Sequence, residues 1–424
     1  MSALAENRAT GSVPVAGLRA RRFTLPPMAA FVGTAIAFAG LYLAAGAPSP
    51  LFVQYQQEWG FPAGLLTIAF AAYAFALVLA LVIAGSLSDF IGRRPVLIGA
   101  LAVELASMVM FLFASNIGWV IAARVVQGLA TGAATSAFSA SLLELAPERF
   151  KRVAAIVGGA APAGGLGLGA LLAGVAVQFS STASAIVFSA LAIVMLLGAL
   201  VAVFAKETVT RQAGALRSLA PRIAVPAPAR REFAGVIPVL LAGWMFSALF
   251  IGLAPTIVSG IFHIHSGLVE GLTVFIAPGL AAVSGFVLGR FGPRTALQVG
   301  GAGVAIGIAI VVAGIGFELL PLVWVGGLVG GFGFGASFSG SLRLLGPFAS
   351  PHQRAELFAA VFLVAYLSFG IPAVILGQLV APFGLLATVI GFGGVTLVAA
   401  FVGLLVQLGL SRRSSSSAPL SSQA

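Results

Sequence analysis

Gly85-Ser-Leu-Ser-Asp89-Phe-Ile-Gly92-Arg93-Arg94 stands between two long apolar runs, and a related stretch occurs in the second half of the chain. That second stretch is Gly285-Phe-Val-Leu-Gly289-Arg290-Phe-Gly292-Pro-Arg294. In both stretches a glycine closes the apolar run, a second glycine follows at the same spacing, and an arginine comes two residues later. Internal repeats of this kind are typical of membrane transporters built from two related halves. The repeat predicts such a duplicated architecture.

The composition predicts an integral membrane protein. Of the 424 residues, 60% are hydrophobic and only 8% are charged. Soluble domains carry about 25% charged residues, so an ordinary cytosolic enzyme is excluded, as is a disordered protein, which needs low hydrophobicity. The chain has no cysteine and three histidines. Disulfides and thiolate chemistry are therefore excluded, and we expect neither a metal site nor a cofactor.

Twelve apolar runs are each long enough to cross a bilayer, which takes roughly 20 helical residues. Helices satisfy their own backbone hydrogen bonds in lipid, so the predicted fold is all-α with twelve transmembrane helices. The predicted spans are residues 29–49, 62–84, 95–113, 118–142, 152–176, 182–204, 233–257, 267–288, 295–314, 319–342, 355–379 and 384–409.

The longest hydrophilic stretch between spans divides the chain into two six-helix halves. We expect an N-terminal tail at 1–28, a first half at 29–204, a central loop at 205–232, a second half at 233–410 and a disordered tail at 411–424. Both tails and the central loop are predicted to be cytoplasmic. A site for a small molecule is expected between the halves.

The cations give the orientation. All but one of the 22 lysines and arginines fall in the two tails or in the loops of one side. Cytoplasmic loops carry such an excess, so both termini are predicted to lie in the cytoplasm. The net charge of +11 is explained by this membrane sidedness, and no nucleic-acid partner is expected. The Ala-, Gly- and Arg-rich composition without cysteine favours a bacterial inner-membrane protein.

Residues 85–94 resemble the signature between helices 2 and 3 of the major facilitator superfamily. The residues that carry the resemblance are Gly85, Leu87, Asp89, Gly92, Arg93 and Arg94. Phe90 stands where the family often has a basic residue. The resemblance implies that this loop latches helix 2 against the start of helix 11, near Ala355, in the state closed to the cytoplasm. Simple packing at the membrane edge is the competing interpretation.

Spans 4 and 5 carry further resemblances to that family. Arg124, Gln127 and Gly128 resemble its helix 4 signature, whose arginine is associated with proton coupling in proton-driven members. Pro162, Gly164 and Gly165 resemble the helix 5 signature of its antiporters, although Ala161 replaces the glycine expected before the proline. The glycines also allow close helix packing without any such role.

Glu104 is the one carboxylate in the middle of a predicted span. Its depth and that of Arg124 differ by roughly 7 Å at 1.5 Å per residue, which a long arginine side chain partly bridges. We hypothesise a Glu104–Arg124 pair whose protonation is linked to transport. A structural ion pair, or a Glu104 protonated throughout, is the alternative. Span 1 lacks the acidic residue that many proton-coupled exporters use.

In the resembled family, helices 1, 4, 7 and 10 line the central cavity. The candidates on these and the flanking helices are Tyr42, Tyr73, Gln127, Thr131, Trp244, Ser247, Ser337 and Tyr366. Each of them also fits an ordinary core or lipid-facing position. Together they form an apolar, lightly polar set, which favours an amphipathic or lipophilic small-molecule substrate.

The sequence thus predicts a secondary transporter, a monomer in the lipid bilayer, that exports small amphipathic compounds in exchange for protons by alternating access. The alternatives are a facilitator or importer of a small metabolite, and a non-transporting membrane sensor or scaffold of the same fold. No enzyme is predicted, because the glycine-rich stretches lie inside spans rather than after a strand.

Overall fold

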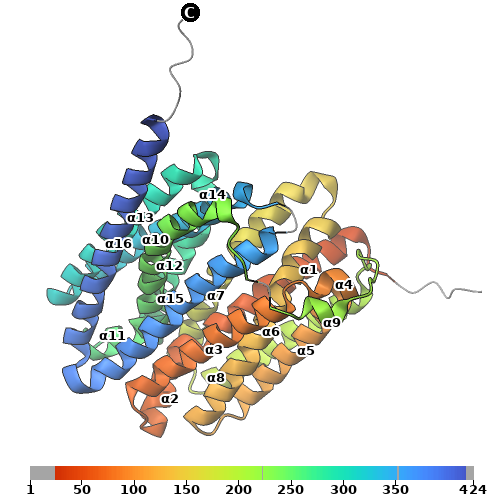
Figure 1. The fold of residues 1–424 in the computed structure, drawn as a ribbon. Helices are drawn as coiled ribbons and strands as arrows, with labels where there is room; N and C mark the ends of the chain where they lie inside the picture. The colour runs from red at the N-terminus through yellow and green to blue at the C-terminus, as the bar shows by residue number, and fades with distance from the viewer. Residues whose placement is uncertain (1–23, 222, 351–352, 417–424) are drawn as a thin grey trace, which may run out of the picture.

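The computed structural model describes residues 24–221, 223–350 and 353–416. Within these residues, twelve helical segments are long and apolar enough to cross a membrane, which confirms the predicted all-α, twelve-span fold (Figure 1). The spans of the first half are α1 Pro27–Gly46 continued by α2 Pro48–Trp59, α3 Ala63–Ala84, α5 Arg93–Leu112, α6 Ile117–Leu145, α7 Lys151–Phe179 and α8 Ala183–Phe204. Those of the second half are α10 Arg230–Ala248 continued by η3 Leu249–Leu253 and α11 Ala254–Gly260, α12 Gly267–Val287, α13 Pro293–Gly316, α14 Leu320–Leu345, α15 Arg354–Phe383 and α16 Leu385–Ser416.

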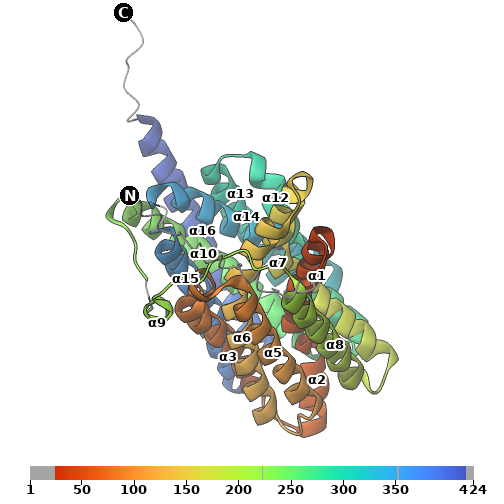
Figure 2. The ribbon, with the colours of Figure 1, turned by 90° about the vertical axis from the view of Figure 1, so that its right-hand side faces the viewer.

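Short helices lie in the loops: α4 Leu87–Ile91, α9 Ala215–Ser218, and the 3-10 turns η1 Glu148–Phe150, η2 Ala227–Ala229, η4 Leu288–Arg290 and η5 Gly346–Phe348. The two halves form two groups of helices that meet along two pairs, α3 with α15 and α7 with α12 (Figure 1). In the side view α7 lies between α1 and α12 (Figure 2). A movement of one half against the other would therefore change the packing of these two helix pairs.

Two spans are broken by their own sequence. The first was expected to end at residue 49, but its helix restarts at Pro48 and runs to Trp59, because a proline is well tolerated in the first turn of a new helix. In the seventh span the α-helix passes through a π-helical turn at η3, just before Pro255. Such π-turns occur mostly as single insertions in α-helices, often at functional sites.

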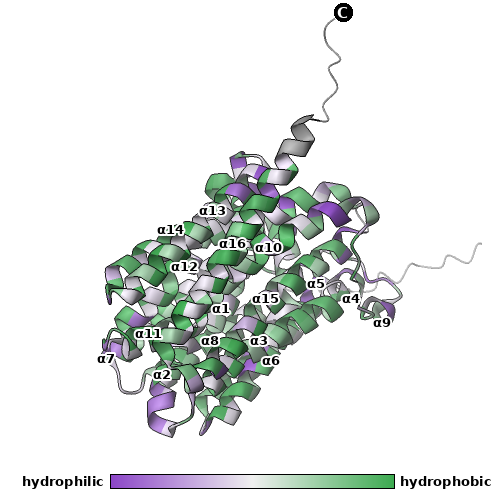
Figure 3. Ribbon diagram, turned by 60° about the vertical axis from the view of Figure 1, so that its left-hand side comes forward, coloured by the Kyte–Doolittle hydropathy of each residue, from purple (hydrophilic) through white to green (hydrophobic). Residues whose placement is uncertain are grey.

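The outer surface of the bundle is apolar along the helices and polar at their ends (Figure 3). Leucine, isoleucine and valine side chains such as Leu197, Ile306 and Val398 are more than half exposed, as lipid-facing residues are. The protein is a multi-pass membrane protein.

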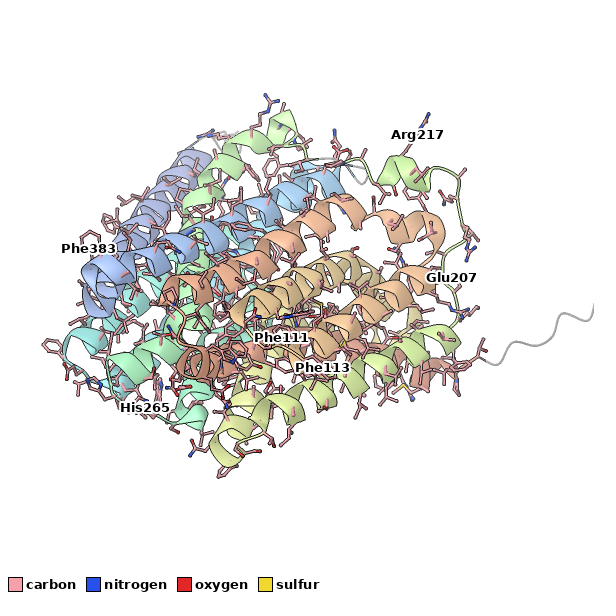
Figure 4. The ribbon with its side chains drawn as sticks, turned by 90° about the horizontal axis from the view of Figure 1, so that it is seen from below. Phe111, Phe113, Glu207, Arg217, His265 and Phe383 are labelled. Carbon is pink, nitrogen blue, oxygen red and sulfur yellow. The ribbon has the colours of Figure 1, made fainter. Side chains whose placement is uncertain are left out.

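We call the end that carries the central loop, Arg152 and Arg290 the basic end, and the end that carries Glu58 and Glu318 the opposite end. Figure 4 shows Glu207 and Arg217 at the basic end, with His265 and Phe383 at the other.

Two boundaries in the described part of the chain differ from those expected. Helix α16 continues to Ser416 although a disordered tail was expected from residue 411, because no glycine or proline interrupts the segment between Leu410 and Ser416. Residues 1–23 and 417–424 lie outside the described part of the chain. The central loop is shorter than expected, since α10 already begins at Arg230.

A central cavity and its buried polar bridge

A cavity of about 780 Å³ lies between the two halves. Helices α1, α3, α6 and α7 of the first half and α10, α12, α14 and α15 of the second contribute to its wall. Its wall reaches Arg152 near the start of α7, Arg290 in η4 and Leu342 near the end of α14. All three lie at the basic end, so the cavity opens there.

At the opposite end the halves are closed by close contacts between backbones. A Cβ atom added to Gly271 of α12 would lie 2.7 Å from the Ala170 carbonyl oxygen of α7, and one added to Gly174 would lie 2.3 Å from the Gly267 carbonyl oxygen. The same two helices are separated toward the basic end, where a Cβ added to Gly158 of α7 would meet nothing within 4 Å. The pair α7–α12 is thus closed at one end and open at the other.

Helices α3 and α15 also pack tightly in the part nearest the opposite end. A Cβ at Gly64 would lie 2.7 Å from the Gln378 amide nitrogen, and a Cβ at Gly377 would lie 1.9 Å from the Thr67 hydroxyl oxygen. Only glycine permits these approaches. Both crossing pairs therefore describe one state, open at the basic end alone.

Five of the eight residues predicted to line the cavity do so: Tyr42, Tyr73, Trp244, Ser247 and Tyr366. Thr131 and Ser337 are buried and do not line the cavity; each hydroxyl donates to the carbonyl oxygen one turn earlier in its own helix, to Gln127 and Gly333, both over 2.9 Å. Gln127 is also buried away from the wall. The sequence could not separate these positions, since all lie on spans of similar composition.

Aromatic side chains dominate the wall around Trp244. The centroid of its ring lies 5.2 Å from that of Phe334, 5.6 Å from Phe338, 5.0 Å from Tyr366 and 6.2 Å from Phe369. Edge-to-face and offset contacts of this kind stabilise aromatic clusters. The indole nitrogen of Trp244 is buried and has no hydrogen-bond partner among the described residues. The cavity thus offers a large apolar and aromatic surface.

Arg124 is buried at 2% exposure, and its guanidinium donates hydrogen bonds to two backbone carbonyls and one side-chain amide. Its Nη1 donates to the Ala45 carbonyl oxygen over 3.0 Å and to Gln127 Oε1 over 2.5 Å, and Nε donates to the Ala69 carbonyl oxygen over 3.4 Å. The guanidinium also lies 4.1 Å from the centre of the Tyr73 ring. Such partners are required because an unpaired charge in the membrane is costly.

Gln127 connects three helices. Its Nε2 donates to the Ala44 carbonyl oxygen over 2.9 Å and to Glu104 Oε1 over 3.2 Å. The Ala44 carbonyl is free because its usual helical donor would be the N–H of residue 48, which is a proline. The kink in span 1 therefore creates the acceptor that Gln127 uses.

Glu104 is fully buried on α5, and its second carboxylate oxygen, Oε2, has no hydrogen-bond partner among the described residues. The predicted neighbourhood of Glu104 and Arg124 is present, but the two are joined through Gln127 rather than by an ion pair. Arg124 lines the cavity and Glu104 does not. The three side chains form what we call the polar bridge.

The small residues of spans 4 and 5 act as contacts between helices. A Cβ at Gly128 would lie 2.4 Å from the Tyr73 carbonyl oxygen of α3, and one at Gly165 would lie 2.8 Å from Cβ of Tyr42 in α1. Gly164 faces α12, where its added Cβ would lie 3.3 Å from Cβ of Ala282. Pro162 lines the cavity. Span 5 thus supplies both the crossing with α12 and part of the wall.

The loop at 85–94 is held within the first half. Arg93 pairs with Asp89 over 2.5 Å and with Glu144 over 3.1 Å, and the Arg94 side chain donates to the carbonyl oxygens of Ala202 and Val203 at the end of α8. Among the described residues no hydrogen bond or ion pair joins Asp89 to α15. The expected latch to helix 11 is not made here, since the halves are apart at this end.

The start of the central loop lies on that same 85–94 loop. Glu207 accepts the backbone N–H groups of Arg93 and Arg94 over 2.9 and 3.1 Å and thereby caps α5. Gln212 donates its N–H to the Phe90 carbonyl oxygen over 2.8 Å, and Ser86 donates to the Ser218 carbonyl oxygen over 3.2 Å. Helix α9 accordingly lies beside α4 (Figure 1).

Sequence reasoning missed several wall residues. They are Thr135, Ser139, Arg152, Pro278, Arg290, Phe334, Phe338, Phe362 and Phe369. The arginines were counted as loop cations, and phenylalanines facing a cavity look the same in sequence as those facing lipid. Thr135 lies one turn after the predicted wall residue Thr131 on α6. Its hydroxyl shares a 2.9 Å hydrogen bond with the Tyr42 hydroxyl.

Two six-helix halves around a cavity that opens at one end define a membrane carrier, and the comparisons agree. The family model of the Major Facilitator Superfamily matches residues 31–317, which is more than half of the sequence. The chain belongs to the Major Facilitator Superfamily. It is therefore a transporter of small-molecule substrates and not an enzyme.

Solved transporters share the fold at low sequence identity. A POT family transporter in complex with 5-aminolevulinic acid superposes with a TM-score of 0.70 at 12% identity, covering 91% of this chain and 96% of that one. The peptide transporter POT in complex with alafosfalin gives 0.70 at 14% identity, with 90% and 94% covered. The nucleoside transporter NupG gives 0.65 at 13%, with 89% and 99% covered. A search of curated proteins finds no match.

Proposed function

We propose that this protein exports small amphipathic compounds from the cytoplasm in exchange for protons, by alternating access. The observation that carries the proposal is the aromatic cavity that opens at the basic end alone. Cation-rich loops face the cytoplasm in membrane proteins, so the basic end is the cytoplasmic one. The state described is then the inward-open state, in which an exporter takes up its substrate.

The polar bridge is the proposed proton site. Glu104 lies outside the cavity wall with one carboxylate oxygen unpartnered, while Arg124 lies in the wall and Gln127 joins them. Proton binding at Glu104 removes a negative charge that lies two hydrogen bonds from the Arg124 guanidinium. Ionisable groups inside a membrane bundle commonly mark proton relays. The bridge thus supports coupling between a proton and the occupant of the cavity.

The second candidate function is a facilitator or importer of a small metabolite. It is favoured by one observation: among the described wall residues there is no aspartate or glutamate that a proton and a substrate could both reach. A carrier without such a group would move its substrate down its own gradient. Flux measured with and without a pH gradient separates the two functions.

The test is dye accumulation in efflux-deficient bacterial cells, with and without a protonophore. Cells with the wild type should accumulate less of an amphipathic dye than empty cells, and the protonophore should remove the difference. Arg124→Ala and Asp89→Asn should behave like empty cells, whereas Arg217→Gln, at an exposed position outside the cavity wall, should behave like the wild type. Equal accumulation in wild-type and empty cells, at confirmed membrane expression, would reject broad export.

A further inference from the structure

The wall of the central cavity is positively charged. Three of its residues are arginines, Arg124, Arg152 and Arg290, and none of the described wall residues is acidic. A cleft lined by one sign of charge concentrates counter-ions and raises their association rate by roughly 10- to 1000-fold. The wall therefore selects against cations and in favour of anions.

Arg152 and Arg290 both line the cavity at the basic end and come from different halves, one near the start of α7 and one in η4. Both are exposed, and within the described residues neither makes an ion pair. Nearby cations behave differently, since Arg93 and Arg294 are each paired with a carboxylate. The charges of the two mouth arginines are thus available to a ligand, whereas Arg124 is already bound within the polar bridge.

The interior supplies the complementary apolar part. Trp244 sits among four aromatic rings within 6.2 Å, and its buried indole N–H has no partner among the described residues. At about 780 Å³ the cavity falls in the usual size range for small-molecule sites.

We propose that the substrate is a monoanionic aromatic compound, of the class of arylalkyl carboxylates, with its ring against the Trp244 cluster and its carboxylate attracted by Arg152 and Arg290. This inference rests on the proposed transport function and narrows it. Rings pack against the aromatic wall, and the two arginines at the mouth attract the anionic head. An amine of the same shape meets only like charge.

Binding of three matched probes to the purified, detergent-solubilised protein tests the proposal. Naphthylacetate, naphthylacetamide and naphthylethylamine carry the same ring with a negative, a neutral and a positive head. By isothermal titration, naphthylacetate should bind at least about tenfold more tightly than either of the others, and raising the salt from low to high should weaken naphthylacetate alone. Equal or tighter binding of the amine or the amide, or no binding of naphthylacetate, would overturn the proposal.

Substitutions of Arg152 and Arg290 test whether these two arginines cause the preference for naphthylacetate. The double variant Arg152→Gln with Arg290→Gln should lose most of the preference for naphthylacetate, whereas Arg217→Gln removes one charge from the same end and should keep it. A double variant that matches Arg217→Gln would overturn the role of the two arginines. If naphthylacetate binds with this arginine dependence but a pH gradient drives none of it across proteoliposomes, the anion site stands and proton-driven export fails.

Discussion

Glu104 and Arg124 are held on opposite sides of one side-chain amide, that of Gln127. The oxygen of this amide accepts from Arg124 over 2.5 Å and its nitrogen donates to Glu104 over 3.2 Å. An amide cannot take up a charge at neutral pH, so it transmits changes in position between the two ionisable groups without titrating itself. The carboxyl group on α5 and the cavity wall at Arg124 on α6 are thereby linked.

Replacing Gln127 with leucine should destabilise the protein. The change leaves the Ala44 carbonyl and Glu104 without a partner and removes one hydrogen bond of Arg124, and an unsatisfied buried polar group costs about 1–3 kcal/mol. Thermal unfolding in detergent should show a lower midpoint. Ser141→Ala is the matched control on α6, because that buried hydroxyl has no partner among the described residues and its loss should not lower the midpoint. An unchanged midpoint in Gln127→Leu would show that the bridge does not stabilise the fold.

Replacing Glu104 with glutamine should separate substrate movement from the proton. The amide keeps an oxygen for the hydrogen bond from Gln127 but cannot bind or release a proton near neutral pH. In proteoliposomes, wild-type flux out of the basic side should rise when the opposite side is made acidic, and the Glu104→Gln flux should not respond. Substrate binding should persist in the variant. A variant that responds to the gradient like the wild type would remove Glu104 from the coupling.

Replacing Gly271 with alanine should open the opposite end. The added Cβ would lie 2.7 Å from the Ala170 carbonyl oxygen and 3.0 Å from the Gly174 Cα atom, and overpacking of this kind costs about 1–3 kcal/mol. That penalty applies to the state closed at this end, so the population shifts toward the alternative.

A Ser247→Cys substitution places a single thiol in the cavity wall, because the natural chain has no cysteine. Labelling of this thiol reports which end of the cavity is open. With Gly271→Ala, a membrane-impermeant maleimide should label it more from the opposite end and less from the basic end. Gly99→Ala is the control, because a Cβ there would meet nothing within 4 Å. Identical labelling in both variants would contradict a pivot at the α7–α12 crossing.

The two glycines of the repeat should differ in their tolerance of alanine. Gly92 has φ of 101° and ψ of 155°, a region almost restricted to glycine, and its added Cβ would lie 2.5 Å from Glu207 Oε2. Gly92→Ala should therefore lower the stability by about 1–3 kcal/mol. Gly292 has φ of −57°, so Gly292→Ala should cost little. Equal unfolding midpoints for the two variants would show that the strain at residue 92 is relieved elsewhere.

Local sequence properties were enough to predict the spans and their order. The twelve apolar runs correspond to the twelve helices because hydropathy is a property of each segment alone. The neighbourhood of Glu104 and Arg124 also followed from their depths along two helices. These features need no knowledge of how helices are turned about their axes.

The cavity wall and the polar bridge depend on that rotation and on distant residues. Thr131 and Thr135 lie one turn apart on α6, yet only Thr135 reaches the cavity. The position of the Gln127 side chain depends on the Ala44 carbonyl oxygen of α1, which is free to accept because residue 48 is a proline. Phe338 faces the cavity and Phe383 is two-thirds exposed on the outer surface, although both are phenylalanines in apolar spans.

The attachment of the central loop has a consequence for how the chain can be divided. Glu207, Gln212 and Ser218 bind the 85–94 loop, so the peptide up to that point belongs to the first half, whereas Val225 already packs against the core of the second half. A polypeptide ending at residue 220 would keep the contacts with the 85–94 loop, and another starting at residue 223 would keep the packing of Val225. The two pieces, made separately in one cell, should reassemble into a working carrier.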